Sequence, residues 1–177
     1  MSEEIIFSGF GGQGVVLAAN VIAQTAVYEG KNMAAMVSYG AEMRGGTSSS
    51  TLIISEKEIY SPVVEHPSVA VVLNQPSLDL YEPLVKKGGL LIVNSSLTDR
   101  KAERKDIDVI YIPATDIANT LGNVKIANMI LVGALVARKR LVSIENVLSI
   151  LPKAFPKNKQ EFVEINKKAI LKGASLG

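Results

Sequence analysis

The sequence predicts an α/β domain: a doubly wound, mostly parallel sheet covered by helices, with a helical C-terminal end. Short apolar runs of strand length alternate with segments whose apolar residues recur at helical spacing. Residues 69–73 and 90–93 are continuously apolar, which is typical of parallel strands covered on both faces. No linker, repeat or low-complexity tract interrupts the pattern, so residues 1–177 are predicted to form a single domain.

The N-terminal part of the pattern predicts one helix among three strands. Residues 4–7 form the first predicted strand. The apolar spacing of residues 13–29 predicts a helix that stops at Gly30, a common helix terminator. The next strands are predicted at residues 33–38 and 47–54. The stretch EKEIYSP that follows predicts a turn into a short hairpin arm.

The remainder predicts three further strands and then helices only. The strands are residues 69–73, 90–93 and 108–112, and Pro76 opens a predicted helix that ends near residues 87–89. After these strands, Thr115 is the predicted cap of a short helix that ends at Gly122, and residues 124–140 are predicted to form a long apolar helix. Ser143 is the predicted cap of a further helix, which ends before Pro156. Asn158 with Glu161 resembles a capping box and predicts the start of the last helix.

The composition excludes several kinds of chemistry for this chain. It has no cysteine, which removes disulfides, thiolate nucleophiles and cysteine-ligated zinc or iron–sulfur clusters. His66 is the only histidine and precedes Pro67, so it is interpreted as a surface turn residue and not as a catalytic base. We therefore predict no catalytic residue and no metal ligand within this chain.

The charge is unevenly distributed along the chain. There are 3 Lys and Arg against 9 Asp and Glu before Lys86, and 16 against 8 from Lys86 onward. This pattern fits either solvated helix faces or a basic surface for an anionic ligand or partner subunit. Nucleic acid is not an expected partner, because basic and aromatic residues are not interleaved. No apolar run is long enough for a membrane span, and the acidic start does not resemble a secretory signal, so a cytoplasmic location is expected.

A glycine-rich loop is the first candidate site. Gly9, Gly11 and Gly14 fit the pattern G-x-G-x-x-G directly after a predicted strand and before a predicted helix. Glycines let the backbone approach a ligand, and the free N–H groups at a helix start favour an anion. A dinucleotide site also needs an acidic residue at the end of the second strand, and this chain has none there. The amide of Gln13 could contact a ligand or partner, or could connect the loop to a neighbouring turn.

A second glycine motif follows the second predicted strand. Gly45 and Gly46 predict a tight turn, and Arg44 on that turn could clamp a phosphate or carboxylate near the first loop, or pair with Glu42. The next strand carries hydroxyl side chains on both faces from Thr47 to Thr51, which indicates a sheet edge or a face that meets something polar; we favour a subunit interface.

Polar residues also end the strands near residues 73 and 93. Asn74, Gln75 and Asn94 could cap the following helices or line the same crevice. Glycines, amides and one arginine, without a nucleophile or a general base, favour binding over chemistry at this edge.

Three segments together resemble a known family. GFGGQGV near the N-terminus, YGAEMRGGTSSS about thirty residues later and NVKIANMILVGAL late in the chain resemble the gamma subunit of the 2-oxoacid:ferredoxin oxidoreductases. The resemblance covers essentially the whole chain and implies a Rossmann-like, three-layer α/β/α domain. It places Gly9, Gly11, Gly12, Gln13 and Gly14 in the first family segment, Arg44, Gly45 and Gly46 in the second, and Asn128 and Gly133 in the third, where a small residue lets helices approach closely.

The resemblance also implies a division of labour among subunits. Such enzymes oxidatively decarboxylate a 2-oxoacid to an acyl-coenzyme A and reduce ferredoxin. Thiamine diphosphate with Mg is expected on the alpha and beta subunits, and iron–sulfur clusters on cysteine-bearing partners such as a ferredoxin-like delta subunit. The gamma subunit is associated with coenzyme A access and assembly, and alone it is expected to be inactive. Two alternatives are a standalone nucleotide- or flavin-binding protein and a purely scaffolding subunit.

Overall fold

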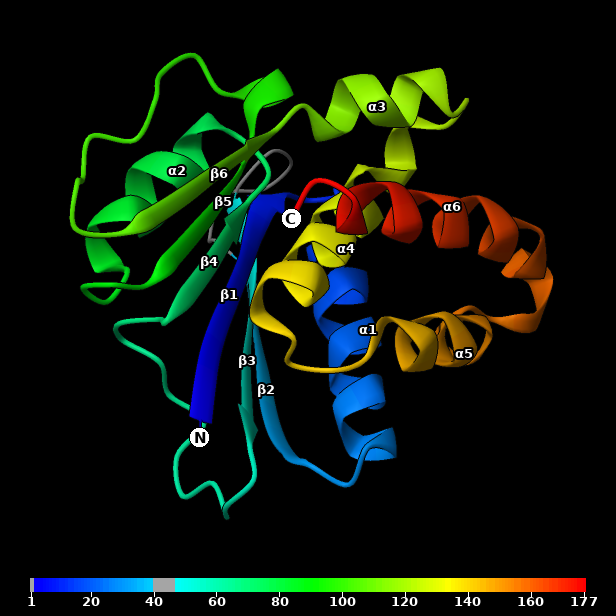
Figure 1. Ribbon diagram of the computed structural model, residues 1–177, viewed down its shortest axis with the longest axis horizontal. Coiled ribbons are helices and arrows are strands. Elements are labelled where there is room, and N and C mark those ends of the chain that lie inside the picture. Colours follow the sequence, from blue (N-terminus) through cyan, green and yellow to red (C-terminus); the bar gives the residue numbers. More distant parts are fainter. Residues whose placement is uncertain (1, 40–46) are drawn as a thin grey trace.

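The computed structural model describes residues 2–39 and 47–177, whose strands form one six-stranded sheet in the order β2-β3-β1-β4-β5-β6 (Figure 1). The strands are β1 (Ser2–Phe10), β2 (Asn32–Tyr39), β3 (Thr47–Ser55), β4 (Val69–Val72), β5 (Leu90–Asn94) and β6 (Asp108–Ile112). β1, β4, β5 and β6 are mutually parallel, whereas β3 is antiparallel to both β1 and β2. The predicted α/β class with a mostly parallel sheet is therefore confirmed.

The antiparallel pairing of β2 with β3 follows from the length of their connection. Only residues 40–46 separate the two strands, whereas a parallel crossover needs about a dozen residues or more. Short connections between adjacent strands produce hairpins. β2, the strand that follows α1, lies at the edge of the sheet, and β4 pairs in parallel with β1.

Helices cover the sheet unequally on its two faces (Figure 1). The helices are α1 (Val15–Tyr28), α2 (Gln75–Tyr81), α3 (Ala114–Thr120), α4 (Ala127–Lys139), α5 (Ile144–Ala154) and α6 (Val163–Ala174). α1 and α4 lie on one face, and α5 and α6 pack on them, while α2 covers the other face at β4 and β5 (Figure 1). The expected layering and the helical C-terminal end are both present.

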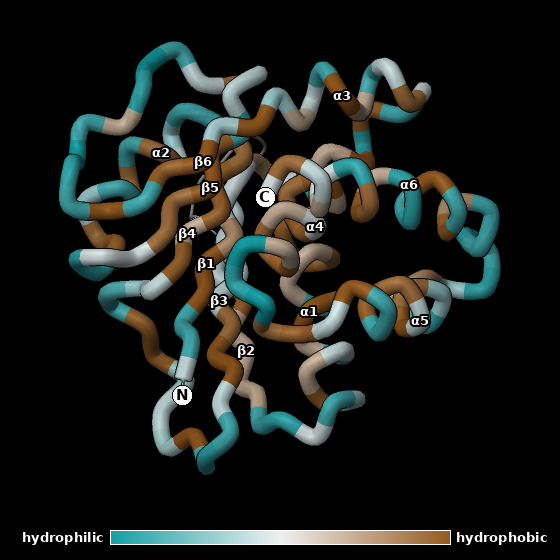
Figure 2. Tube along the Cα trace, in the orientation of Figure 1, coloured by the Kyte–Doolittle hydropathy of each residue, from teal (hydrophilic) through white to brown (hydrophobic). Residues whose placement is uncertain are grey.

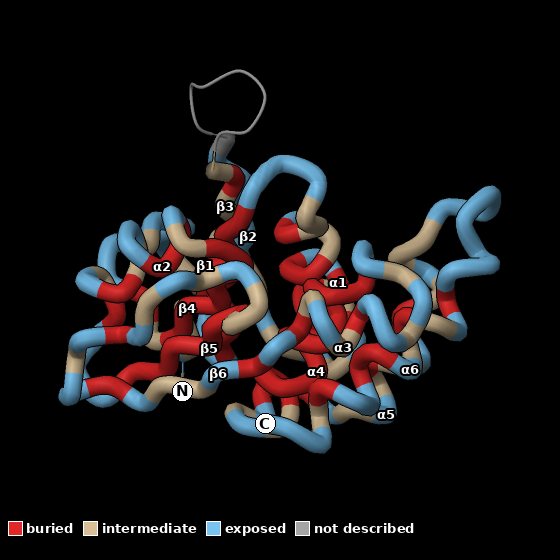
Figure 3. Tube along the Cα trace, turned by 90° about the horizontal axis from the view of Figure 1, so that it is seen from above, coloured by how far each residue is buried: buried red, intermediate tan, exposed pale blue. Residues whose placement is uncertain are grey.

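The apolar core lies mainly between the sheet and the α1 and α4 helices. Figure 2 shows that hydrophobic residues are concentrated in the central strands and in α4, and Figure 3 shows that these elements are largely buried. The large side chains that fill this core include Phe7, Ile22, Leu52, Met129 and Ile130. A smaller cluster on the opposite face packs Leu78 of α2 against Val72, Leu91 and Val93. Burial on both faces explains why β4 and β5 are continuously apolar.

α4 and α6 approach each other through glycine. A Cβ placed at Gly133 would overlap the backbone carbonyl of Ile170, and one at Gly173 would overlap the carbonyl of Ile130. This contact confirms the prediction that the small residue Gly133 allows two helices to approach closely.

Some local predictions were wrong and one was confirmed. The described residues 56–68 contain no strand, so the predicted hairpin arm is absent. α6 begins only at Val163, and the preceding residues form a 3₁₀ turn (Lys157–Phe162), so Asn158 caps no helix. That turn is held instead by the amide of Gln160, which donates to the carbonyl oxygens of Pro152 and Phe155. Ser143 does cap α5, its Oγ accepting from the Asn146 N–H at 3.1 Å.

Within the described residues, no helix has the length and apolar character to cross a bilayer.

Candidate functional site

The glycine loop lies where predicted, between the end of β1 and the start of α1. Gly14 precedes the helix with φ of 76°, and Gly12 has φ of 91°, both in the left-handed region that favours glycine. α1 has no acidic residue in its first turn and no side-chain cap. The N–H groups at its start are thus available to an anion at the carboxyl edge of the parallel strands.

Packing explains two of the loop glycines. A Cβ at Gly9 would lie 2.6 Å from the Oε1 atom of Gln13 and 3.1 Å from the Cβ of Leu73. A Cβ at Gly14 would overlap the side-chain amide of Asn128, which donates to the Gly14 carbonyl at 2.9 Å. Asn128, in the third family segment, is therefore the residue that fixes the loop onto α4.

The tip of the loop has a different character. Gly11 and Gly12 are exposed, and a Cβ added at either would meet nothing within 4 Å. Gly12 needs glycine for its backbone conformation, but Gly11 lies outside the left-handed region. Among the described residues, neither packing nor backbone strain requires glycine at position 11, so the tip is open to a surface that approaches from outside them.

Gln13 connects the loop to the neighbouring strand end. Its Oε1 atom accepts from the Phe10 N–H at 2.7 Å and from the Asn74 amide at 3.0 Å. The side chain could contact a ligand or partner, or could connect the loop to a neighbouring turn; its oxygen atom does the second. Gln13 also lines a hollow beside the loop, so contact of its amide nitrogen with a ligand or partner stays a prediction.

The asparagines at the strand ends organise the same edge. Asn74 Oδ1 caps α2 by accepting from the Ser77 N–H at 3.0 Å. Asn94 Oδ1 accepts from the N–H groups of Ala114 and Thr115, at 3.1 and 3.3 Å, and thereby caps α3. The predicted cap, Thr115, instead lies inside the helix and its hydroxyl accepts from the Asn94 amide at 2.9 Å. Both asparagines are buried, so their first role is to hold the site together.

Two hollows flank the loop and meet at Gly12. The smaller, of about 130 Å³, is lined by Gly12, Gln13, Asn94, Thr115 and Lys125, together with apolar residues. The larger, of about 460 Å³, runs along the start of α1 and is lined by Gly11, Gly12, Gly14, Val16, Asn20 and Ser48, among others. Among the described residues that line either hollow, Lys125 is the single titratable one. The arrangement suits binding of an anionic or amide-rich group, and the described residues supply no acid–base pair.

Sequence reasoning missed Lys125. It is exposed and, among the described residues, forms no ion pair. The available signal was its place in NVKIAN, two residues before the helix that carries Asn128. The predicted Arg44, Gly45 and Gly46 lie outside the described residues, so their closeness to the loop stays a prediction.

β3 occupies an interior position. It pairs with β1 and β2, which rules out the predicted sheet edge for the hydroxyl-rich strand. Ser48 and Ser50 share the face of Leu52 and are buried, whereas Ser49 and Thr51 are half-buried on the opposite face. A polar surface contact by that second face stays a prediction.

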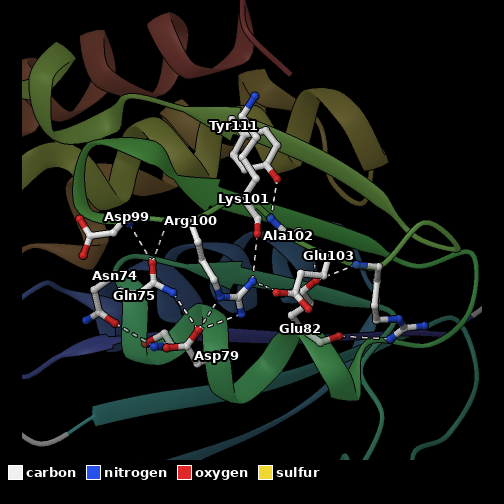
Figure 4. A network of polar contacts seen from close by, with 12 residues as sticks. Asn74, Gln75, Asp79, Glu82, Asp99, Arg100, Lys101, Ala102, Glu103 and Tyr111 are labelled. Carbon is white, nitrogen blue, oxygen red and sulfur yellow. Dashed lines mark hydrogen bonds and ion pairs between the residues drawn. The ribbon is translucent and has the colours of Figure 1, made fainter.

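An ionic network joins the end of α2 to the connection between β5 and β6 (Figure 4). Glu82 is 3% exposed and binds Arg100 at 2.7 Å, while its second oxygen accepts from the Arg104 N–H at 2.9 Å. Burial alone would raise the pKa of Glu82, but the hydrogen bonds from the Arg104 N–H and the Arg100 guanidinium outweigh it and lower that pKa below 4.5. The network attaches the connection between β5 and β6 to α2. Within the described residues no group of three acidic or histidine side chains could hold a metal.

Comparisons with known proteins agree on one family. A family model described as pyruvate ferredoxin/flavodoxin oxidoreductase matches residues 4–176. The chain is 37% identical over 165 residues to the 2-oxoglutarate synthase subunit KorC of Methanocaldococcus jannaschii, covering 91% of this chain and 88% of that protein. It is 34% identical to the pyruvate/ketoisovalerate oxidoreductases common subunit gamma of Thermococcus litoralis, covering 86% of each.

A solved structure has the same architecture. The gamma subunit of a keto/oxoacid ferredoxin oxidoreductase from Geobacter sulfurreducens superposes with a TM-score of 0.87 at 32% identity, covering 99% of this chain and 96% of that chain.

Proposed function

Because this chain belongs to the pyruvate ferredoxin/flavodoxin oxidoreductase family, we propose that it serves as the gamma subunit of a multisubunit 2-oxoacid:ferredoxin oxidoreductase. In that role it works with thiamine-bearing alpha and beta subunits and a ferredoxin-like delta subunit. The chain has no cysteine, so electrons must pass through clusters on those partners. The isolated chain is expected to be inactive.

The observation that carries the proposal is the exposed tip of the glycine loop. Gly11 and Gly12 present backbone without side chains at the carboxyl edge of the sheet, and no described residue fills the space beside either position. A Cβ-free surface of this kind permits a ligand or a partner to contact the backbone directly. We assign it the finer role of contributing to coenzyme A access and to subunit assembly.

The residues around the loop fit coenzyme A chemically. The N–H groups at the start of α1 and the ammonium group of Lys125 suit the phosphates, and the amides of Gln13 and Asn20 suit the pantetheine amides. Bound there, coenzyme A supplies the thiol that accepts the acyl group formed on another subunit. The contribution of this chain is to bind and orient the cofactor.

The decisive experiment measures coenzyme A dependence in the reconstituted holoenzyme. Loss of a charge-assisted contact costs about 1.5–3 kcal/mol, so Lys125→Ala should raise the KM for coenzyme A by about tenfold or more and leave the KM for the 2-oxoacid unchanged. Lys168→Ala, an exposed lysine on α6, is the matched control.

Two further measurements separate the ligand role from the assembly role. Isothermal titration of the chain with coenzyme A should release heat if the chain binds it alone. Absence of heat, together with unchanged coenzyme A affinity in Lys125→Ala and Arg44→Ala holoenzymes, would remove the ligand role and leave assembly. Failure of the chain to co-purify with alpha and beta subunits would remove both.

A further inference from the structure

β2 is an edge strand without the usual protection against pairing. Its described side chains, Asn32 to Ser38, contain no charge and no proline. Ala35 is exposed, and Met36 and Val37 are 47% and 43% exposed. Natural edge strands are normally short, charged, bulged or covered, because a long uncharged edge recruits another strand.

The opposite edge of the sheet shows what protection looks like in this chain. β6 has only five residues, Asp108–Ile112. It begins with Asp108, whose carboxylate binds Arg138 at 2.8 Å. The hydroxyl of Tyr111 accepts from the Ala102 N–H at 2.8 Å, in the connection that precedes the strand. The eight residues of β2 have no comparable device among their described side chains.

The sequence of β2 is complementary to itself in an antiparallel register. Residues 33, 35 and 37 share the helix-covered face, because Met33 and Ala35 pair with Ile54 and Leu52 of β3, which belong to the helix-side core. An antiparallel pair related by a two-fold axis must place residues of the same face opposite each other. An axis at Ala35 places Met33 opposite Val37 and Ala34 opposite Met36. Each exposed large side chain then meets a different apolar side chain, and no like charges meet.

We propose that the β2 edge pairs with the β2 edge of a second copy of this chain, in antiparallel register about Ala35. The two sheets become one continuous sheet, and the free backbone groups along the edge are satisfied. This interaction surface is separate from the proposed role of the glycine loop, and neither depends on the other.

α1 supplies a second layer for the same interface. It packs on β2 and β3, and Val27 near its C-terminal end is exposed and does not line the hollow beside the glycine loop. Paired strands alone bury little surface compared with the roughly 1,200 Å² of a stable interface. Contact between two α1 helices beside the paired strands adds apolar area from Val27, which is 58% exposed.

A charge-swap experiment tests the proposal directly. We expect the full chain to sediment as a dimer at micromolar concentration. Ala35→Lys places two lysines together at the axis, and Ala35→Glu places two glutamates there, so each variant alone should weaken dimerisation by more than about tenfold. An equimolar mixture of the two should dimerise again, because opposite charges then meet. Leu80→Lys, at a side chain that is 49% exposed on α2, which packs on β4 three strands away from β2, is the control and should remain dimeric.

The absence of cysteine permits a test of the register. Residues opposite each other in an antiparallel pair have Cα atoms about 4.5–5.5 Å apart, within the range for a disulfide. Ala35→Cys should cross-link under mild oxidation, and Leu80→Cys, on α2, should not. A chain that is monomeric at all concentrations, or a dimer that resists both Ala35→Lys and Ala35→Glu, would overturn the proposal. Circular dichroism of each variant shows whether the fold is kept.

Discussion

Asn128 couples α4 to the glycine loop through one buried amide. Its Nδ2 atom donates to the Gly14 carbonyl at 2.9 Å, and the side chain is 2% exposed. Asn128→Ala leaves that carbonyl unpaired and opens space beside the loop. We expect a loss of about 1–3 kcal/mol in the free energy of unfolding, measured by urea denaturation. Asn119→Ala, at an exposed position of α3, should change it by less than about 0.5 kcal/mol. Equal effects would show that Asn128 does not hold the loop.

Glu82 makes the free energy of unfolding of the chain depend on pH in the acidic range. Its pKa is lowered in the folded state relative to 4.5, so its stabilising contribution is present above that pH and is lost as the pH falls through 4.5 and below. Glu82→Gln cannot ionise. The variant should be less stable than the parent at neutral pH. Its free energy of unfolding should also fall less than that of the parent between pH 6 and pH 3, an interval of about 3 units in which carboxylates titrate.

The control for this prediction is Glu103→Gln. The side chain of Glu103 is exposed, and only its backbone N–H contacts Glu82. This variant should keep the acid sensitivity of the parent. If Glu82→Gln also keeps it, another carboxylate is responsible.

At the scale of the element, the α4–α6 contact depends on two glycines that face the partner backbone. Gly133→Val improves intrinsic helix propensity but forces the helices apart, because its Cβ would overlap the Ile170 carbonyl. Overpacking costs about 1–3 kcal/mol or more, and we expect a lower melting temperature in differential scanning calorimetry. Gly11→Val, which adds the same side chain where no described residue lies within 4 Å, should melt as the parent does. An unchanged melting temperature in Gly133→Val would show that the helices can separate without cost.

The helices and strands were largely predictable from the local sequence pattern, whereas the distant residues that contact and cap them were not. The apolar runs at residues 69–73 and 90–93 and the Ser143 cap depend on neighbours along the chain, and the structure has them. The cap of α3 comes from Asn94, twenty residues before the helix, so no local signal at Thr115 could identify it. The cap predicted at Asn158 failed because a 3₁₀ turn held by Gln160 replaced the first turn of the helix.

The site shows the same division between local and distant information. The glycine spacing predicted the loop, its position before α1 and its exposure at the carboxyl edge. It could not separate Gly9 and Gly14, which are fixed by Leu73 and Asn128, from the open tip, because those contacts join distant parts of the chain. Lys125 was missed for the same reason, since it meets the loop only through the fold.

At the scale of the whole molecule, the chain presents separate surfaces with separate roles. The carboxyl edge carries the glycine loop and its two hollows, and the β2 edge carries an unprotected strand. Several of the basic residues that follow Lys86 are already paired within the chain, as Arg100, Arg138 and Lys139 show. Part of the basic excess is therefore structural and solvated, and among the described residues Lys125 is the cation that lines the candidate site.

The central claim is that the tip of the glycine loop acts in the assembled enzyme and not in the stability of this chain. Gly12 is a poor probe, because its φ of 91° strains any other residue. Gly11→Val is the sharper probe, because it adds a side chain without backbone strain and without contact to any described residue. The measurement compares coenzyme A-dependent 2-oxoacid oxidation by holoenzymes reconstituted with the parent and with Gly11→Val chains of equal melting temperature. We predict a large rise in the KM for coenzyme A, or failure of the complex to assemble. Full activity with unchanged coenzyme A affinity would contradict the claim.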